Sequence, residues 1–261
     1  MPTQFMRLRR LRRSLVAGRG ALLLTHLPNL LYLVGFRGTS GVLVVTRRAV
    51  VLFVPGLYRD QARGEVTGAR VRVAPDPLRA AADWLRRSNL RRVACENHHL
   101  SVAQFEQLRQ WLGREIELAD AESLAERLRA IKSSAEIRQI RAALALTARA
   151  FEEVLPLVRP GVRELELAAE IEFRLKRYGA RGAAFETIVA SGPRSALPHG
   201  RATAKRLKKN ELVIFDLGAI LDDYHSDMTR TVYLGRPPAR VKRIYGAVKE
   251  ALEHAHAAVR A

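Results

Sequence analysis

Two aspartates eleven residues apart constrain this chain more than any other feature of its sequence. Asp216 lies in the segment VIFDLGA and Asp227 in the segment HSDMTRT. Both segments have the composition of β-strands, and a short polar break at Asp222-Asp223 separates them. The pattern predicts a β-hairpin that brings the two carboxylates close together.

A two-residue turn at Leu221-Asp222 would place Asp216 directly opposite Asp227, with the Cβ atoms about 5 Å apart on one face. Two carboxylates held there repel each other unless a cation lies between them or one is protonated. Aspartate oxygens are hard ligands, so a divalent metal would remove the repulsion. The alternative is that the two aspartates are unrelated turn or strand-end residues, and the spacing alone leaves both interpretations open.

Length and composition indicate an ordinary globular protein. A chain of 261 residues can form one large domain or two, and its 48% hydrophobic and 27% charged content is typical of such proteins. We expect no transmembrane helix, because no run of 18 or more apolar residues occurs. No signal peptide is expected either, so we expect a cytoplasmic protein without a membrane partner. The single Cys95 excludes an internal disulfide and a cysteine-based zinc site.

The net charge of +19 is high, and 38 of the 45 basic residues are arginine. No acidic residue precedes Asp60. A surface that binds nucleic acid would show this charge as one concentrated basic face. The arginines are instead spread along the sequence and aromatic residues make up only 6%, which argues against nucleic acid as the main partner. An acidic portion missing from this chain would also explain the imbalance.

The first 122 residues alternate between strand-like and helix-like segments, which predicts a compact α/β domain. Ser101 is a plausible helix N-cap, because serine is a favoured residue there and Ser101 lies at the start of a helical pattern. The expected strands are residues 21–25, 41–45, 49–54 and 91–95, and the expected helices are residues 7–16, 77–87 and 101–112.

From residue 123 onward the sequence predicts long helices followed by an antiparallel sheet, and hence an α+β domain. Ser133 and Glu136 form a capping-box pattern that opens a helix reaching about residue 157. A second helix is expected to end at Gly179, a favourable residue just beyond a helix C-terminus. The expected elements that follow are the helix 163–178 and the strands 186–190, 211–217 and 228–234.

Residues 240–261 form an amphipathic helical pattern whose apolar stripe must be buried against something. The chain stops there without a capping glycine or a further strand, so we expect a domain that is cut part-way through. The stripe consists of Val241, Ile244, Tyr245, Val248, Leu252 and Val259.

Several segments, in order, resemble the pita-bread metallopeptidases, and within them the Xaa-Pro branch of aminopeptidase P and prolidase. They are FETIVASG, PHG, FDLGA and YHSDMTRT, together with LRAIKSSAEI, which is similar to the opening of that family's catalytic domain, and NLLYLVGF of its N-terminal domain. The resemblance covers nearly the whole chain. It implies a creatinase/prolidase-like N-terminal α/β domain, residues 1–122, followed by the first half of an α+β pita-bread domain, residues 123–261.

The resemblance implies a metal-dependent exopeptidase that hydrolyses Xaa-Pro bonds with two divalent ions, commonly Mn, Co or Zn, held by five side chains. Asp216 matches the ligand that chelates one ion, and Asp227 matches the ligand that bridges both. His199 matches a histidine that hydrogen-bonds the substrate and stabilises the transition state. Thr229 shares a strand face with Asp227, and its hydroxyl could orient a metal ligand or be an ordinary strand threonine. The resemblance also implies a proline-containing peptide as substrate and a homodimer.

The family's other three ligands, a histidine and two glutamates, lie beyond the second aspartate and outside this sequence. Two aspartates alone should bind metal weakly, so we expect this chain by itself to be inactive or nearly so. His254 and His256 are poor replacements, because residues i and i+2 of a helix point apart. His98 and His99 lie in a segment that the family does not use to bind metal. Glu211, Asp222 and Asp223 are interpreted as turn and strand-edge residues.

Two other functions remain possible for the sequence. A creatinase-like amidinohydrolase shares the fold but works without metal, and the presence of both Asp216 and Asp227 argues against it. A non-catalytic pita-bread module that binds peptide, histone or nucleic acid would suit the positive charge. The sequence does not distinguish which metal is used or whether the substrate is a dipeptide or a longer peptide.

Overall fold

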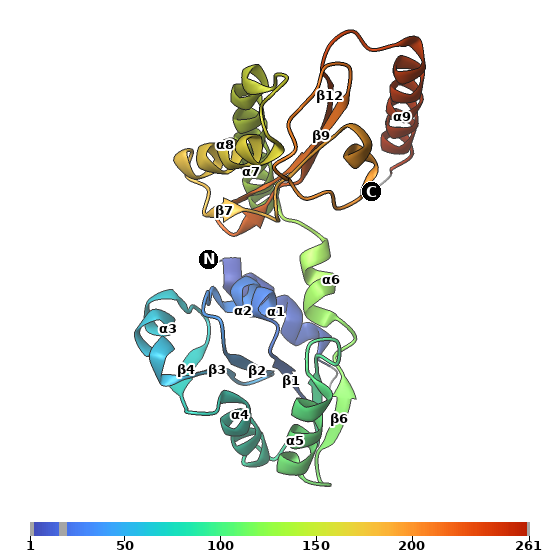
Figure 1. The fold of residues 1–261 in the computed structure, drawn as a ribbon. Coiled ribbons are helices and arrows are strands. Elements are labelled where there is room, and N and C mark those ends of the chain that lie inside the picture. The colour runs from blue at the N-terminus through green and yellow to red at the C-terminus, as the bar shows by residue number, and fades with distance from the viewer. Residues whose placement is uncertain (1–2, 16–19, 260–261) are drawn as a thin grey trace. The chain divides into compact units, whose positions relative to one another are not determined.

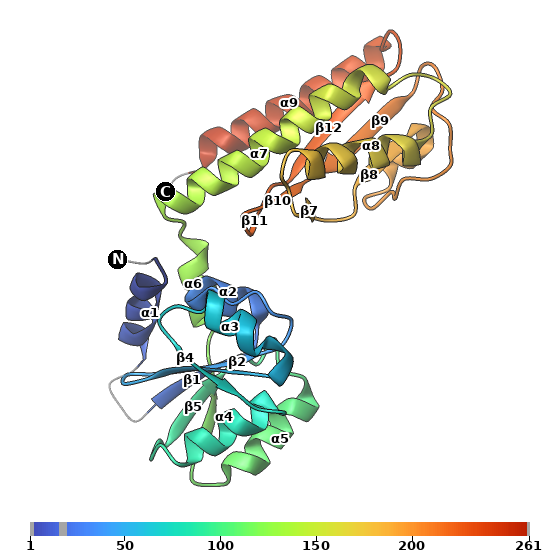
Figure 2. The same ribbon diagram turned by 90° about the vertical axis from the view of Figure 1, so that its left-hand side faces the viewer.

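The computed structural model describes residues 3–15 and 20–259. The chain divides into two compact units, one ending at Ile131 and the other beginning at Lys132 (Figures 1 and 2). The first unit has one sheet and two hydrophobic clusters, and the second unit has two small sheets and one hydrophobic cluster. In the described residues, no helix combines the length and the apolar character needed to cross a membrane.

The first unit is built on a six-stranded mixed sheet with the order β4-β3-β2-β1-β5-β6. The strands β1, β2 and β3 pair antiparallel, whereas β4, β5 and β6 join the sheet through parallel pairings. Every residue of β2 and β3 is buried, which fits their unbroken apolar sequences. The strands are β1 Gly20–Leu24, β2 Val42–Thr46, β3 Val50–Val54, β4 Arg70–Val73, β5 Arg92–Cys95 and β6 Glu117–Asp120.

Helices cover both faces of this sheet, so alternate residues of β1 enter two different cores. Leu22 and Leu24 pack with α1, α2, α3 and α6, whereas Ala21 and Leu23 pack with α4 and α5. The expected N-cap at Ser101 is confirmed, since its side chain forms a capping box at the start of α5. The helices are α1 Thr3–Ser14, α2 Leu27–Val34, α3 Arg59–Glu65, α4 Pro77–Arg86, α5 Val102–Leu112 and α6 Leu124–Ala130, with a short 3-10 helix η1 Gly56–Tyr58.

The helix α6 belongs to the first unit. Ala125 is buried in the core that contains α1 and α2, and Leu124 and Leu128 pack against it. The boundary expected at 122/123 therefore precedes α6, whereas the structure divides the chain after this helix. The sequence shows where helices begin, but it does not show which core a short helix joins.

The second unit contains two small sheets, with the strand orders β12-β9-β8 and β11-β10-β7. Ser133 and Glu136 form the expected capping box, and Gly179 adopts a positive φ of 96° just after α8. The elements are α7 Ser134–Val154, η2 Leu155–Leu157, α8 Glu164–Arg177, β7 Gly182–Ala183, β8 Ile188–Ser191, η3 Gly192–Ala196, β9 Leu212–Leu217, β10 Ala219–Leu221, β11 Tyr224–His225, β12 Met228–Tyr233 and α9 Ala239–Ala258.

The central strand β9 has one buried and one open face. Val213, Phe215 and Leu217 are buried in a core shared with α7 and α8, which lie beside the sheet in Figure 1. The residues between them, including Ile214 and Asp216, are only half-buried. Asp216 therefore projects from the face that α7 and α8 do not cover.

The helix α9 contains no buried residue. Ile244, Tyr245, Val248 and Leu252 of the apolar stripe are each more than half exposed. The burial expected for this stripe is not found among the described residues. The helix forms as the 3.6-residue periodicity predicts, but its apolar face has no partner in this part of the chain.

Candidate active site

One hairpin carries both aspartates. The strands β9 and β10 run into it and β11 and β12 return, with Leu221 opposite Tyr224 and Asp216 opposite Thr229. The two turn residues are Asp222 and Asp223, whose φ angles are 48° and 68°. Two consecutive positive φ angles are what a two-residue type I′ hairpin turn requires.

The turn expected at Leu221-Asp222 lies one residue further along the chain, at Asp222-Asp223, and this shifts the register by two residues, so that Asp216 lies opposite Thr229 instead of Asp227. A positive φ is costly for leucine but tolerated by aspartate, so Leu221 stays in the ladder and the turn moves along the chain. Continuing the observed register places Asp227 opposite Gly218 and one diagonal step from Asp216. Such neighbours have Cβ atoms roughly 7–8 Å apart or slightly less. A shift of two residues preserves the face on which a side chain projects, whereas a shift of one would reverse it.

The backbones of the two arms of the hairpin approach each other closely beside Asp227. A Cβ atom at Gly218 would lie 2.1 Å from the Ser226 carbonyl oxygen, so only glycine fits there. The Ala219 amide donates to the Ser226 hydroxyl at 2.9 Å, and that hydroxyl lies 2.7 Å from Thr147 Oγ1 on α7. These buried contacts fix the segment that immediately precedes Asp227 to the helix beneath it.

Asp216 is half-buried on β9, between Ile188 of β8 and Thr229 of β12. The Thr229 hydroxyl donates a hydrogen bond to Asp216 Oδ1 at 3.0 Å. This contact supports the orienting role considered for Thr229 over the interpretation as an ordinary strand threonine. Asp227 is exposed, and its carboxylate forms no hydrogen bond or ion pair with the rest of residues 3–15 and 20–259. The two carboxylates offer hard oxygen donors that no protein cation occupies, so this donor set fits a divalent ion.

His199 lies in the turn that follows η3 and is exposed. Its carbonyl oxygen accepts a hydrogen bond from the Arg201 amide at 2.9 Å. The structure does not bring the His199 side chain into contact with either aspartate. Its segment joins β8 to β9, the strand that carries Asp216, so the three candidate residues belong to connected elements of one sheet.

Glu164 anchors the segment that carries His199. Its side chain is buried at the start of α8 and accepts hydrogen bonds from the backbone and hydroxyl of Ser191, at 2.8 and 2.7 Å. It also accepts from the backbone and hydroxyl of Thr203, at 3.1 and 2.7 Å, and from Arg194 Nε at 3.2 Å. Burial raises the pKa of Glu164, but the hydrogen bonds from Thr203 and Ser191 outweigh it, so the pKa lies below its ordinary value.

Sequence reasoning missed Glu164, because a glutamate in the first turn of a helix is commonplace. Its partners Ser191 and Thr203 lie 27 and 39 residues further along the chain. A glutamate followed by an apolar helical pattern gives no signal of these contacts. Only the folded arrangement shows that both ends of the His199 segment are tied to one carboxylate.

The other candidates lie outside this site. His254 and His256 are exposed on α9, and His98 is exposed in the loop after β5. Glu211 pairs with Lys205 at 2.9 Å, while Asp222 and Asp223 form the hairpin turn, as expected for strand-edge and turn residues. His99 differs from the others, because it lies within a cluster of three potential metal ligands, described below.

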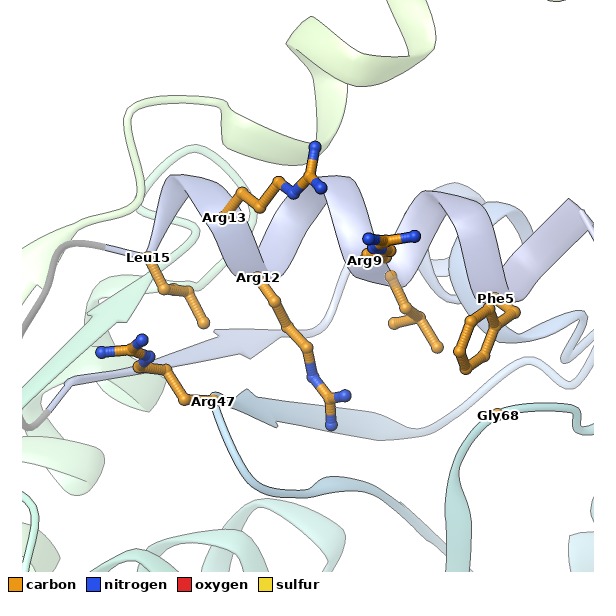
Figure 3. Close-up of a pocket in the computed structure, with 8 residues that line it drawn as sticks. Phe5, Arg9, Arg12, Arg13, Leu15, Arg47 and Gly68 are labelled. Carbon is orange, nitrogen blue, oxygen red and sulfur yellow. The ribbon is translucent and has the colours of Figure 1, made fainter.

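Positive charge gathers along α1 in the first unit. Arg9, Arg12 and Arg13 of this helix and Arg47 of the β2–β3 turn line a cavity of about 690 Å³ (Figure 3). Arg12 Nε donates to the Thr46 carbonyl oxygen at 3.1 Å. No acidic side chain is among the lining residues, so the cavity has the charge of an anion site rather than a metal site.

Comparison with known proteins identifies the family of this chain. Residues 7–131 match the creatinase/prolidase N-terminal domain, and residues 138–261 match metallopeptidase family M24. The chain belongs to metallopeptidase family M24. The break between the two matches agrees with the division of the structure after Ile131. Membership of M24 implies the use of divalent metal.

Relatives and solved structures of this M24 chain support both halves of the fold. It is 32% identical to a Xaa-Pro dipeptidase of Pyrococcus horikoshii over 90% of this chain and 66% of that protein. A Xaa-Pro dipeptidase structure from Bacillus anthracis superposes with a TM-score of 0.89 at 31% identity, covering 95% of this chain and 70% of the other. An X-Pro aminopeptidase structure from Thermotoga maritima gives 0.83 at 30% identity, covering 94% and 70%. The M24 chain thus spans about two thirds of the length of these relatives.

Proposed function

We propose that this chain forms the N-terminal domain and the first half of the catalytic domain of a metal-dependent exopeptidase that hydrolyses Xaa-Pro bonds. The observation that carries the proposal is the hairpin of the M24 unit. Its register places Asp227 one diagonal step from Asp216, and the Thr229 hydroxyl donates a hydrogen bond to Asp216. The relatives named as Xaa-Pro dipeptidases and the X-Pro aminopeptidase structure support the substrate class.

In this proposal each residue has a distinct role. Divalent ions such as Mn, Co or Zn, when bound, supply a nucleophile at neutral pH and polarise the scissile carbonyl. Asp216 and Asp227 hold the ions, and the Thr229 hydroxyl fixes the direction of the Asp216 carboxylate. His199 donates a hydrogen bond to the proline-containing substrate and stabilises the transition state. The protein acts in the cytoplasm as a homodimer, with the first unit helping to limit the length of the peptide.

The resemblance to M24 enzymes implies five ligands for the pair of ions. Two carboxylates alone should therefore hold the ions weakly. We therefore propose that the 261-residue chain alone has little or no activity. The test compares this chain with the product of the reading frame extended beyond Ala261, both assayed with Mn²⁺ and a Xaa-Pro peptide. Activity only in the extended protein supports the proposal, and equal activity in both contradicts it.

The substitution Asp227→Asn in the extended protein tests the metal role directly. It removes a charged ligand while preserving side-chain volume, so we expect loss of Xaa-Pro hydrolysis. Asp222→Asn is the matched control, because Asp222 lies in the same hairpin and asparagine tolerates its positive φ. Full activity of the Asp227 variant would refute the role. Hydrolysis of a guanidino substrate that survives complete chelation would favour the metal-independent amidinohydrolase.

The arginine-lined cavity favours one second candidate, a module that binds nucleic acid. Such binding weakens steeply with salt, with a slope of about −0.9 for each phosphate contact on duplex DNA. The double substitution Arg9→Ala, Arg13→Ala should make this slope shallower. Arg12 is not substituted, because its side chain also donates a hydrogen bond to the Thr46 carbonyl oxygen. Salt-independent binding, or no binding to an oligonucleotide, would exclude this function.

A further inference from the structure

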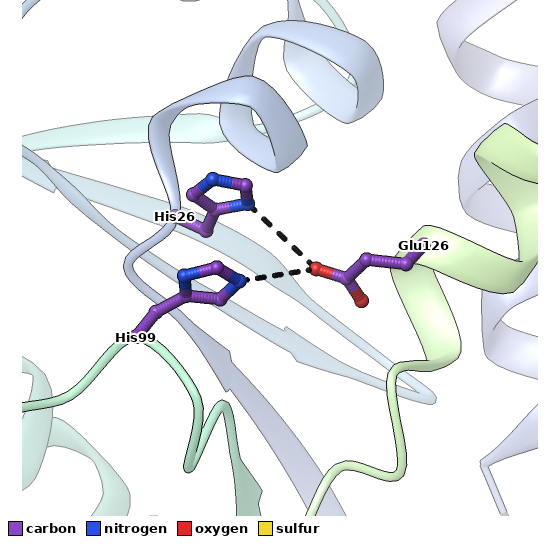
Figure 4. A group of neighbouring side chains, drawn as sticks. All are labelled: His26, His99 and Glu126. Carbon is purple, nitrogen blue, oxygen red and sulfur yellow. Dashed lines mark ion pairs between the residues drawn. The ribbon is translucent and has the colours of Figure 1, made fainter. Parts of the chain in front are cut away.

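Three side chains from separate segments of the first unit converge on one point (Figure 4). His26 lies between β1 and α2, His99 lies in the loop after β5, and Glu126 lies on α6. The two imidazole rings stack with centroids 3.6 Å apart and planes 6° apart. His26 Nδ1 and His99 Nε2 lie 3.7 and 3.6 Å from the same atom, Glu126 Oε1.

These separations are too long for hydrogen bonds and are compatible both with an ion pair and with ligands around a metal. An N–H···O hydrogen bond joins atoms about 2.7–3.2 Å apart. Around a tetrahedral zinc ion, with bonds of about 2.1 Å, neighbouring nitrogen and oxygen ligands are roughly 3.4 Å apart. The two observed separations from Glu126 are close to that value, and the three ligand atoms all lie within 4.8 Å of one another.

His26 Nδ1 is buried and has no hydrogen-bond partner. Buried polar atoms usually have one, so this nitrogen needs an explanation. The Glu126 carboxylate oxygen lies 3.7 Å away, so a cation bound between the two atoms would supply the missing partner. A neutral imidazole is the form that binds a metal.

The carboxylate of Glu126 is held in place by a hydrogen-bond network. Asn29 Nδ2 donates to Glu126 Oε1 at 2.6 Å and to Glu96 Oε1 at 2.5 Å, and Arg129 donates to Asn29 Oδ1 at 2.9 Å. Burial raises the pKa of Glu126, but the hydrogen bond from Asn29 helps to bring it below its ordinary value. Glu96 Oε2 accepts from the His26 backbone amide at 2.8 Å. Contacts of this kind orient the side chains that bind metals.

The cluster also has room for a further ligand. A cavity of about 10 Å³ lies beside His99 and Glu126, and its other lining residues are Glu96, His98, Asp120 and Ser123. This is close to the volume needed by the centre of one water molecule, about 10–15 Å³. The side chain of His99 is 31% exposed, which gives an ion access from solvent.

We propose that His26 Nδ1, His99 Nε2 and the Glu126 carboxylate bind a zinc-class divalent ion, with water as the fourth ligand. Two imidazoles and one carboxylate are ligands that suit zinc, cobalt and nickel. An imidazole lone pair lies in the plane of its ring, so binding opens the parallel stack through rotation about the Cβ–Cγ bonds. The site lies in the first unit, whereas Asp216 and Asp227 lie in the second. The ion ties α6 to the loops that follow β1 and β5.

The experiment uses the 261-residue chain carrying Asp216→Asn and Asp227→Asn, which removes the other candidate ligands. Calorimetry with Zn²⁺ should show one equivalent bound per chain. With Co²⁺ the same protein should show the intense visible absorption of a four-coordinate ion. Adding His99→Ala should weaken binding by at least roughly 100-fold, because loss of an outer contact alone costs about 10–100-fold.

His254→Ala is the control, since His254 is exposed on α9 and lies outside both the cluster and the small cavity beside it. It should leave the Zn²⁺ affinity and the Co²⁺ spectrum unchanged. Glu126→Gln, which removes the charge but keeps a carbonyl oxygen, should also lose binding, and circular dichroism checks that each variant is folded. Zn²⁺ should raise the melting temperature of the parent and the His254 variant but not of the His99 variant.

Three results would overturn the proposal. They are absence of Zn²⁺ binding by the folded parent, unchanged affinity in the folded His99 variant, and an equal loss in the His254 and His99 variants.

Discussion

At Asp216, one hydroxyl group determines how the carboxylate is presented. Thr229 Oγ1 bonds to Oδ1, so that oxygen is held in place while the side chain stays half-exposed. Thr229→Val keeps the β-branched shape and removes the hydroxyl. We expect the Mn²⁺ affinity of the extended protein to fall by about 10–100-fold, measured from the electron paramagnetic resonance signal of free Mn²⁺.

The control for this variant is Thr231→Val on the same strand. Thr231 lies opposite Ile214 rather than Asp216 and is exposed. Its substitution should leave the Mn²⁺ affinity unchanged. Equal affinities for the two variants would show that the hydroxyl at 229 has no part in metal binding.

Cys95 is a fully buried thiol on β5. Burial, and then the charges of Asp120 and Glu96, raise the pKa of Cys95 to about 11. Since the thiolate is the reactive form, we expect negligible reaction with Ellman's reagent at pH 8 in the folded chain. After unfolding in guanidinium the reagent should detect one thiol per chain. Rapid reaction of the folded chain would contradict this assignment.

At the scale of elements, Glu164 joins α8 to β8 and to the segment near Thr203. Glu164→Gln replaces one carboxylate oxygen with an NH2 group. This group would face N–H and O–H groups that now donate hydrogen bonds to the carboxylate. We expect the free energy of unfolding to fall by about 2–4 kcal/mol in urea titrations. Glu172→Gln on the same helix is the control and should change it by less than about 0.5 kcal/mol.

The contribution of Glu164 also depends on pH. Its native pKa lies below its ordinary value, so on acidification the unfolded chain binds the proton first. The stability that the carboxylate provides is fully present above the unfolded pKa of about 4.3 and is lost as the pH falls through the native pKa. The difference in stability between wild type and Glu164→Gln should therefore be constant from pH 6 to 7 and shrink below about pH 4. A difference that grows on acidification would contradict the lowered pKa.

The elements themselves were largely predictable from local signals. The capping boxes at Ser101 and Ser133 start helices where the sequence indicates, and Gly179 follows the end of α8. The hairpin turn was misplaced by one residue and the register by two, because the alternation of apolar residues is the same in either register. The positive φ angles at Asp222 and Asp223 supply the missing constraint.

At the scale of the molecule, two units with separate cores make up the chain. Leu43 is fully buried in the first unit, so Leu43→Ala should destabilise that unit by about 2–5 kcal/mol. Hydrogen exchange should show faster exchange in β1 and β3, with protection of β9 unchanged. Equal loss of protection in β9 would show that the two cores unfold together.

The sequence by itself determined the α/β and α+β halves, the family and the residues Asp216, Asp227 and His199 as candidates. These conclusions rest on periodicity, helix caps and short motifs. Each of these is a local pattern that can be recognised within a short stretch of sequence. Only the tertiary structure decided that α6 belongs to the first unit, that Glu164 holds the His199 segment, and that His26, His99 and Glu126 meet. Those contacts join residues as much as 100 positions apart, as between His26 and Glu126, and chain folding alone brings them together.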